Sequence, residues 1–352
     1  MRIAIDDVIY QLQKNRPRGI SRMWSNLIPH MKEMLELKHE LILLSREDSV
    51  CEDFELEMHK LPNYSYRSRA EDMQRLDTLC KKLQVDLFIS TYYTRAPSIK
   101  SLVFVHDMIP ERRDFFKTRP QFYERADNYV NADILVCNSE YTKKDLLRIY
   151  GKQLRTKKIY VSLLAVSNSF YPAKKQDIKK AKTVHGIKSD YFIVDGEPTE
   201  EMSNQFFKAL SSLKKNISIV SYGGTLKGYM IADCVKYKIP YVNIRWMDEK
   251  YVPKIISGAK GMIFLSECEG FGLPILEAMA CGTPVLCSNN TALPEVGGNA
   301  VHYITNYDYK SIRKNLALFL QNSHHHIKNG LNRSKLFSWK TTAKKLVEAI
   351  DV

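Results

Sequence analysis

Residues Gly261 to Pro284 read GMIFLSECEGFGLPILEAMACGTP and join three kinds of local structure. The apolar run Gly261–Leu265 is typical of a buried parallel strand. Gly270 and Gly272 follow it and allow backbone dihedral angles that other residues avoid. Pro274 suits the first turn of a helix. The order strand, glycine turn, helix predicts a ligand site, because ligands in open α/β sheets bind at the carboxyl ends of the strands.

The turn and its helix carry groups that suit an anionic sugar derivative. Backbone N–H groups from Phe271 to Leu273, at the start of the helix, would face a phosphate group. We expect Glu269 to lie in the loop and Glu277 about two turns into the helix. Two carboxylates in one cleft suit hydrogen bonding to sugar or ribose hydroxyls. Solvated glutamates after an ordinary glycine turn are the structural alternative.

This stretch resembles the signature of glycosyltransferase family 4, whose members are retaining, nucleotide-sugar-dependent enzymes of the GT-B fold. The family pattern is E-G-F-G-L-P-x-L-E-A-M-A-C-G-T-P, with seven residues between its two glutamates. Glu269 to Glu277 match it, together with nearly every flanking position. Asn289–Gly298 resembles the next loop of the family, which contains L-P-E-V-x-G. The resemblance extends over about thirty consecutive residues, which makes chance agreement a poor explanation.

The composition is that of an ordinary globular protein. A chain of 352 residues predicts two domains, each large enough to bury its own core. No apolar run reaches the length that spans a bilayer, and Met1–Asp7 reads as a first strand that ends in carboxylates rather than a signal peptide. The seven cysteines are scattered without a CxxC pair, which favours reduced thiols and a cytoplasmic location over disulfides or structural zinc.

The net charge of +14 predicts an anionic partner. Nine lysines and arginines and no acidic residue lie between Lys310 and Lys345. A nucleic acid, peripheral contact with an anionic membrane surface and a phosphorylated acceptor would all fit this charge, and so would a solvated helix face. No nucleic-acid motif accompanies the charge, so we expect no nucleic-acid partner.

Apolar strands alternate with amphipathic helices along the chain, which predicts an α/β fold. The expected strands are Arg2–Ile5, Glu40–Leu44, Leu87–Ser90, Ser101–His106, Ile134–Cys137, Lys158–Ser162, Tyr191–Gly196, Ile217–Val220, Pro240–Asn243, Gly261–Leu265 and Thr283–Cys287. The expected helices include Ile20–Leu37, Ala70–Leu83 and Thr142–Tyr150.

The resemblance implies the GT-B architecture, in which two Rossmann-like domains face each other across a cleft. We expect an acceptor-side domain over residues 1–168 and a nucleotide-sugar-binding domain over residues 169–335. Residues 336–352 would form a closing helix that packs back toward the N-terminal domain.

The resemblance also indicates three site residues in the first domain. His106 ends an apolar strand and matches a histidine that the family often carries there, where it would stabilise the transferred sugar. A satisfied, half-buried histidine is the alternative. Gly19 and Arg22 resemble the G-I-x-R turn of the family, which lies opposite the donor. They would contact phosphate or acceptor, or would simply begin a helix that carries a surface arginine.

One departure from the family concerns the donor diphosphate. The family usually carries an Arg and a Lys, as R-K-N, that neutralise this group. Met202 and Ser203 stand at those positions, before the matching Asn204, and three glutamates lie nearby. Each charge-assisted hydrogen bond contributes roughly 1.5–3 kcal/mol, so two lost bonds would weaken donor binding considerably. The candidate replacements are Arg22, Lys227, Arg245 and the helix start at Leu273. A divalent metal recruited by the glutamates is a further alternative, although the resemblance implies no required cofactor.

The sequence therefore predicts a retaining glycosyltransferase that moves a sugar from a nucleoside-diphosphate donor to a hydroxyl of a glycan, polysaccharide or lipid-linked acceptor. Glu269 and His106 would be its catalytic residues. The donor-binding residues would be Gly270, Phe271, Gly272, Leu273, Glu277, Lys227 and Arg245. One alternative is a GT-B protein without transfer activity that serves as a partner or binding module, and another is a sugar-nucleotide epimerase or a phosphorylase.

Overall fold

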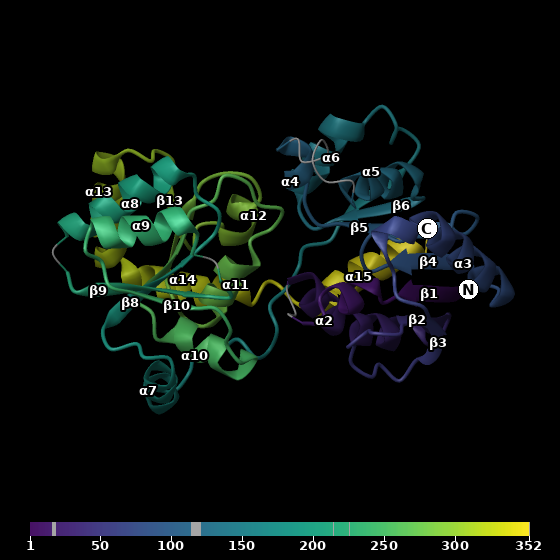
Figure 1. Ribbon diagram of the computed structural model, residues 1–352, viewed down its shortest axis with the longest axis horizontal. Helices are drawn as coiled ribbons and strands as arrows, with labels where there is room; N and C mark the ends of the chain where they lie inside the picture. The colour runs from purple at the N-terminus through teal and green to yellow at the C-terminus, as the bar shows by residue number, and fades with distance from the viewer. Residues whose placement is uncertain (16–18, 114–120, 214, 225, 352) are drawn as a thin grey trace. The chain divides into compact units, whose positions relative to one another are not determined.

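The computed structural model describes residues 1–15, 19–113, 121–213, 215–224 and 226–351. The chain divides into two compact units. The first consists of Met1–Leu164 and Ser338–Val352, and the second consists of Ala165–Phe337. Each unit contains a parallel sheet accompanied by helices (Figure 1). The predicted α/β class with two Rossmann-like domains is confirmed.

In the first unit the described strands form a seven-stranded sheet in the order β3-β2-β1-β4-β5-β6-β7, and every pairing is parallel. The strands are β1 (Arg2–Asp6), β2 (Glu40–Arg46), β3 (Glu57–Leu61), β4 (Leu87–Ser90), β5 (Lys100–Val105), β6 (Ile134–Cys137) and β7 (Lys158–Val161). The strand β3 was not predicted from the sequence. This strand lies at the edge of the sheet and is largely exposed, so it lacks the apolar run that marks a central strand.

The helices of the first unit are α1 (Val8–Leu12), α2 (Gly19–Leu35), α3 (Arg69–Lys82), α4 (Ile109–Arg112), α5 (Gln121–Asn131), α6 (Glu140–Tyr150) and α15 (Trp339–Ile350). The last of these reaches the first unit from the end of the chain and packs against α2, β6 and β7. Ser162 Oγ donates to the carbonyl oxygen of Thr342 at 3.0 Å, and Thr342 Oγ1 donates to the carbonyl oxygen of Leu163 at 2.7 Å. These bonds fix α15 at the end of β7.

In the second unit the described strands form a six-stranded parallel sheet in the order β10-β9-β8-β11-β12-β13. The strands are β8 (Asp190–Asp195), β9 (Ile217–Tyr222), β10 (Tyr241–Ile244), β11 (Gly261–Phe264), β12 (Val285–Ser288) and β13 (His302–Ile304). The three-residue strand β13 was not predicted, because it is too short to show a periodic pattern.

The helices of the second unit are α7 (Lys175–Val184), α8 (Glu200–Ser212), α9 (Gly228–Lys236), α10 (Val252–Ser257), α11 (Leu273–Ala280), α12 (Leu293–Gly297), α13 (Tyr309–Gln321) and α14 (Ser323–Ser334). A cluster of apolar side chains that includes Phe192, Phe207 and Phe319 fills its core. Across the described residues of both units, no helix combines the length and the apolar character that crossing a bilayer requires.

The two sheets share one winding pattern. In each, the order runs outward from the first strand through the second and third, and the fourth strand pairs on the opposite side of the first. The strand order therefore reverses beside β1 in the first unit and beside β8 in the second. Ligands of doubly wound sheets bind outside the carboxyl ends of the strands at such a reversal.

Candidate functional site

The turn between β11 and α11 lies beside the reversal point of the second sheet. Gly272 has a φ of 107°, in the left-handed region. A Cβ atom there would lie 2.7 Å from Cδ2 of Leu293, so both the backbone angle and the space favour glycine. Pro274 occupies the first turn of α11, and the N–H of Ile275 donates to the carbonyl oxygen of Gly272 at 3.2 Å. Gly272 and Pro274, both within the turn, therefore favour its backbone geometry.

The end of β12 and the loop after it form hydrogen bonds with this turn. The N–H of Ser266 donates to Ser288 Oγ at 3.0 Å, and Asn290 Nδ2 donates to the carbonyl oxygen of Ser266 at 2.9 Å. The N–H of Glu269 donates to Thr291 Oγ1 at 3.2 Å. The two segments that resemble consecutive motifs of one family therefore form a single hydrogen-bonded unit.

A cavity of about 190 Å³ opens at the carboxyl ends of β8 and β11. Its lining residues are Asp195, Gly196, Glu197, Lys227, Phe264, Glu269 and Pro274. The structure thus brings together two of the predicted residues, Glu269 and Lys227, that are 42 positions apart in the chain. Among the described lining residues, three carboxylates accompany one lysine.

The other residues predicted for the donor side are not among the lining residues of this cavity. Gly270, Phe271, Gly272 and Leu273 form the turn that leads into α11. Glu277 is 6% exposed on the same helix and does not line the cavity. Arg245 is exposed after β10, which β9 separates from β8, so the structure does not bring it to this cavity.

The loop after β8 approaches the loop after β11 closely. Gly196 has a φ of 97°, and a Cβ atom there would lie 2.6 Å from the carbonyl oxygen of Leu265. Glycine is therefore required by both the backbone angle and the neighbouring backbone. The next residue, Glu197, receives Lys227 Nζ at 3.1 Å, and the two side chains are 53% and 45% exposed. This half-exposed ion pair lies at the cavity.

Met202 and Ser203 stand where the resembled family carries its Arg and Lys, and the structure buries both in the second unit. Met202 is part of the hydrophobic core. Ser203 Oγ donates to Asp233 Oδ2 at 2.6 Å, and Asn204 Nδ2 donates to Asp233 Oδ1 at 2.9 Å. These side chains attach α8 to α9, and neither Met202 nor Ser203 lines the cavity. Neither of these two positions therefore supplies a cation to the cavity, in agreement with the departure from the family pattern seen in the sequence.

In the first unit His106 directly follows β5 and is 7% exposed. Burial lowers its pKa to about 4, nearby Asp107 raises it, and nearby Arg125 lowers it further. The ring therefore carries no charge at pH 7. Asn138 Nδ2 donates to the carbonyl oxygen of His106 at 2.6 Å and holds the strand end in place. Arg125, 3% exposed, pairs with both Asp107 and Glu111.

Gly19 and Arg22 lie in the first turn of α2, and both are partly exposed. They belong to the first unit, whereas Glu269 and Glu277 belong to the second. Arg22 accepts a bond from Asn26 Nδ2 at its carbonyl oxygen, at 2.7 Å, which is an ordinary contact along a helix.

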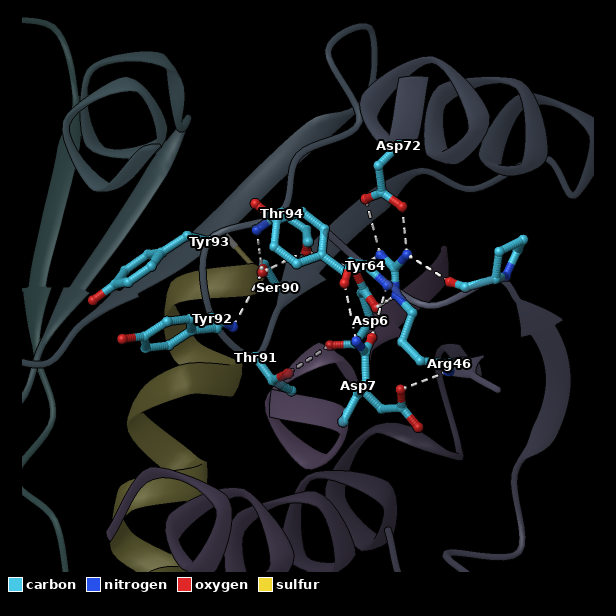
Figure 2. Close-up of polar contacts among 12 residues, drawn as sticks. Asp6, Asp7, Arg46, Tyr64, Asp72, Ser90, Thr91, Tyr92, Tyr93 and Thr94 are labelled. Atoms are coloured by element: carbon cyan, nitrogen blue, oxygen red, sulfur yellow. Dashed lines mark hydrogen bonds and ion pairs between the residues drawn. The ribbon is translucent and has the colours of Figure 1, made fainter. Parts of the chain in front are cut away.

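A buried ionic network that the sequence analysis missed occupies the carboxyl edge of the first sheet (Figure 2). Arg46, at the end of β2, is fully buried. Its Nε and Nη2 donate to Asp6 at 2.9 and 2.5 Å, and its Nη1 donates to Asp72 at 2.5 Å. Burial alone would lower the pKa of Arg46, but the charges of Asp6 and Asp72 raise it well above its ordinary value.

This network also fixes the loop after β4. Thr94 Oγ1 donates to Asp6 Oδ2 at 2.6 Å, and Ser90 Oγ lies 2.8 Å from Thr94 Oγ1. Thr91 Oγ1 donates to the carbonyl oxygen of Asp6 at 2.7 Å. Figure 2 shows Tyr92 and Tyr93 on the same loop. The acidic end of β1 was the only signal of this network in the sequence.

Two further features of the described residues bear on ligand binding. They contain no cluster of three or more His, Cys, Asp or Glu side chains arranged to hold a metal ion. A larger hollow of about 560 Å³ lies between β3 and α3, with Lys60, Arg75 and Lys82 among its lining residues. None of the site residues predicted from the sequence lines it.

Two protein families match this chain. Residues 17–162 match Glycosyltransferase Family 4, and residues 198–333 match Glycosyl transferases group 1. Together the two matches cover most of the chain, one in each structural unit.

Several bacterial proteins are similar in sequence. The O-antigen chain mannosyltransferase B of Escherichia coli is 36% identical over 107 residues, which is 30% of this chain and 28% of that protein. The serotype-specific mannosyltransferase WbdA of Escherichia coli is 41% identical over 92 residues, 25% of this chain and 11% of that protein. The O-antigen chain mannosyltransferase RfbU of Salmonella typhimurium is 26% identical over 234 residues, 64% of this chain and 62% of that protein. The chain thus matches less than two thirds of the length of each of these relatives.

Solved structures are similar over the whole chain. A sucrose-phosphate synthase from Thermosynechococcus elongatus has a TM-score of 0.73 at 14% identity, over 100% of this chain and 98% of that chain. Anabaena HepE, in complex with UDP-glucose, has a TM-score of 0.71 at 14% identity, over 100% and 99%. WaaG, a glycosyltransferase involved in lipopolysaccharide biosynthesis, has a TM-score of 0.70 at 12% identity, over 99% of each chain. At these identities the likeness concerns the fold, which is GT-B. With both units matched by glycosyltransferase families, this chain belongs to the glycosyltransferase family 4 type.

Proposed function

We propose that this protein is a retaining glycosyltransferase that moves a mannosyl residue from a nucleoside-diphosphate donor to a hydroxyl group of a glycan acceptor. Its family supports the transferase class. The choice of mannose is supported by the relatives in Escherichia coli and Salmonella typhimurium, which are all named as mannosyltransferases. Two of those names refer to the O-antigen, which supports a polysaccharide acceptor, carried on a lipid or free.

The observation that carries the proposal is the position of Glu269. Its half-buried side chain shares a cavity with Pro274, which begins α11. The N–H groups of Ile275 and Leu276 bond back to Gly272, and proline has no N–H. A diphosphate at this helix start would therefore meet the N–H groups of Phe271, Gly272 and Leu273, which favour negative charge.

The two glutamates would bind different parts of the donor. Glu269, in the cavity, would accept hydrogen bonds from hydroxyls of the transferred sugar. Glu277, a turn into α11 and 6% exposed, would accept them from the ribose hydroxyls. A carboxylate that accepts bonds from both hydroxyls of a ribose selects a nucleotide over inorganic phosphate, because phosphate offers no such donors.

The chemical demand of the reaction is stabilisation of the leaving diphosphate. As the bond between the anomeric carbon and the phosphate oxygen breaks, negative charge grows on the phosphate, and helix N–H groups aimed at it stabilise that charge. The acceptor hydroxyl would attack from the side of the leaving group and pass its proton to the departing phosphate oxygen. The configuration at the anomeric carbon is then retained.

His106 would contribute from the first unit as a neutral group. Because burial holds its pKa at about 4, it would donate a hydrogen bond to a sugar hydroxyl and would not act as a cation at pH 7. Gly19 and Arg22 would contact the acceptor or a phosphate. No metal is required in this scheme, because the helix start and the cation at the cavity carry the charge.

We also propose a cytoplasmic protein with peripheral contact to an anionic membrane that bears the acceptor. The support is the run of basic residues from Lys310 to Lys345, of which most are exposed. These residues lie in α13 and in or directly after α14 of the second unit, and in α15 of the first. Arg333 has an internal role, since its Nε donates to the carbonyl oxygen of Val296 at 3.0 Å.

The test is binding followed by transfer. Wild-type protein, Glu277→Gln and the control Glu249→Gln are heated with a panel of nucleoside-diphosphate sugars, with and without Mg²⁺. Glu249 is exposed in the same unit, so this control removes an equal charge outside the proposed site. A donor at a hundredfold over its Kd should add about 2.7 kcal/mol of stability to the wild type and to the control. The Glu277→Gln variant should require roughly 10- to 100-fold more donor.

Transfer is then measured with radiolabelled GDP-mannose and a mannose-terminated oligosaccharide, and the anomeric configuration is read by NMR. An α-linked product from the α-configured donor supports the proposal. Release of an epimerised free sugar nucleotide would identify an epimerase instead. Absence of binding across the whole panel would favour a binding module without transfer activity.

A further inference from the structure

The cavity of the second unit has an unfavourable charge for its proposed ligand. Asp195, Glu197 and Glu269 contribute three carboxylates to its lining, and Lys227 is the single cation among the described lining residues. A nucleoside diphosphate adds about two further negative charges. Such a ligand binds only where cations or aligned N–H groups offset this repulsion.

The start of α8 does not offer that compensation. Thr199 Oγ1 already accepts the N–H of Met202 at 3.1 Å, and Glu200 and Glu201 place acidic groups in the first turn. The helix end is therefore capped and negatively charged. Met202 and Ser203, where the resembled family carries its cations, are buried and uncharged.

The start of α9 has the opposite character. Lys227 occupies its N-cap position, and among the residues that the structure describes no side chain caps this end and no acidic residue lies in its first turn. The dipole of the nine-residue helix therefore adds positive potential close to the lysine. The hydroxyl of Tyr229 donates to the carbonyl oxygen of Pro198 at 2.6 Å and holds this helix end beside the loop after β8.

Lys227 is engaged by a neighbour that a ligand can replace. Its Nζ lies 3.1 Å from Glu197 Oε1, and about half of each side chain is exposed. Ion pairs exposed to this degree are weak, because water screens both charges. A diphosphate carries more charge than one carboxylate and offers several acceptor oxygens, so it competes well for the same ammonium group.

We propose that Lys227 is the cation that binds the donor diphosphate, and that Glu197 holds it until the donor displaces the carboxylate. This inference rests on the proposed function, since it assumes a nucleoside-diphosphate ligand at this cavity. Glu197 then competes with the donor for Lys227 and lowers the affinity for the donor. Removing Glu197 should strengthen binding, and removing Lys227 should weaken it.

The experiment measures the binding of GDP, UDP and ADP by calorimetry to the whole protein at low salt. The variants are Lys227→Gln, Glu197→Gln, the double variant and the control Glu200→Gln. Glu200 is an exposed carboxylate three residues from Glu197 and makes no ion pair with Lys227 among the described contacts. Circular dichroism confirms that each variant is folded.

For the nucleotide that binds the wild type, Lys227→Gln should weaken binding about tenfold or more, and Glu197→Gln should tighten it severalfold. In the double variant, Glu197→Gln should tighten binding less than it does in the wild-type background, because displacement of the carboxylate from the lysine requires the lysine. Equal tightening by Glu197→Gln and Glu200→Gln would show a general charge effect and overturn the exchange. Unchanged binding by Lys227→Gln would overturn the role of the lysine while leaving the proposed function intact. If no nucleotide binds the wild type, both proposals fail.

Discussion

The two units place an ion pair at equivalent points of the same winding pattern. In the first unit Asp6 ends the first strand, β1, and Arg46 ends the second, β2. In the second unit Glu197 follows the first strand, β8, and Lys227 follows the second, β9. Asp6 and Arg46 have no exposed side-chain area, whereas Glu197 and Lys227 are 53% and 45% exposed.

Burial gives these two pairs different functions. The guanidinium of Arg46 is bound by two carboxylates and by the carbonyl oxygen of Pro62, so its donors are occupied within the fold. Loss of one partner would leave a charge in a low-dielectric interior. Among the described residues, Lys227 forms an ion pair with Glu197, and because both side chains are about half exposed, its release costs little. The first pair therefore suits structure, and the second suits ligand exchange.

The largest expected effect is that of Arg46→Met, which leaves Asp6 and Asp72 buried without their cation. Such a loss typically destabilises a fold by about 3–5 kcal/mol. The measurement is urea unfolding, followed by near-ultraviolet circular dichroism, to which the buried Trp24 and Trp339 of the first unit contribute. Because the protein has two units, transitions of the two are fitted separately. If the free energy of unfolding fell by less than about 1 kcal/mol, the ion pairs of Arg46 would contribute no more to stability than an exposed ion pair does.

The next effect concerns the free-energy cost of protonating His106, which is buried in the first unit. The folded pKa of His106 is about 4, below its ordinary value of 6.5. Its contribution to stability is therefore complete above pH 6.5 and is lost as the pH falls toward 4. From the size of this shift, we expect the free energy of unfolding to fall by roughly 3 kcal/mol across that range.

This pH dependence is measured by urea unfolding at intervals between pH 4 and pH 7. His106→Asn keeps a polar side chain of similar size but removes the titrating group, so its profile should be flatter by that amount. A profile identical to that of the wild type would assign the acid sensitivity to other groups, such as Asp107 and Glu111.

The smallest effect concerns the exposed pair itself. A double-mutant cycle of Lys227→Gln and Glu197→Gln, without ligand, should give a coupling of about 0.2–1 kcal/mol in unfolding of the second unit. The coupling should fall further in 0.5 M salt, because exposed charges are screened. A salt-independent coupling above about 2 kcal/mol would show that the pair is structural, and it would remove the physical basis of the exchange with a diphosphate.

Much of the fold was predictable because central parallel strands carry continuous apolar runs. The predicted ranges of β4 and β6 agree with the structure, and most other predicted strands differ by one or two residues at their ends. β3 and β13 were not predicted, because β3 is polar and β13 is very short. The turn before α11 was predictable from Gly272 and Pro274, since left-handed geometry and helix starts depend on local chemistry.

The sequence by itself determined the two α/β units and the glutamate-bearing turn, because apolar runs, glycines and proline act over a few neighbouring residues. Only the tertiary structure decided which charges meet. Arg46 lies 40 residues from Asp6 and 26 from Asp72, and Lys227 lies 30 from Glu197, and only the parallel strand order brings their ends together. The tertiary structure also decided which ion pair is buried away from water and which stays exposed. Because the strength of an ion pair depends on its burial, this difference makes the first pair fixed and the second exchangeable, and no local sequence pattern encodes it.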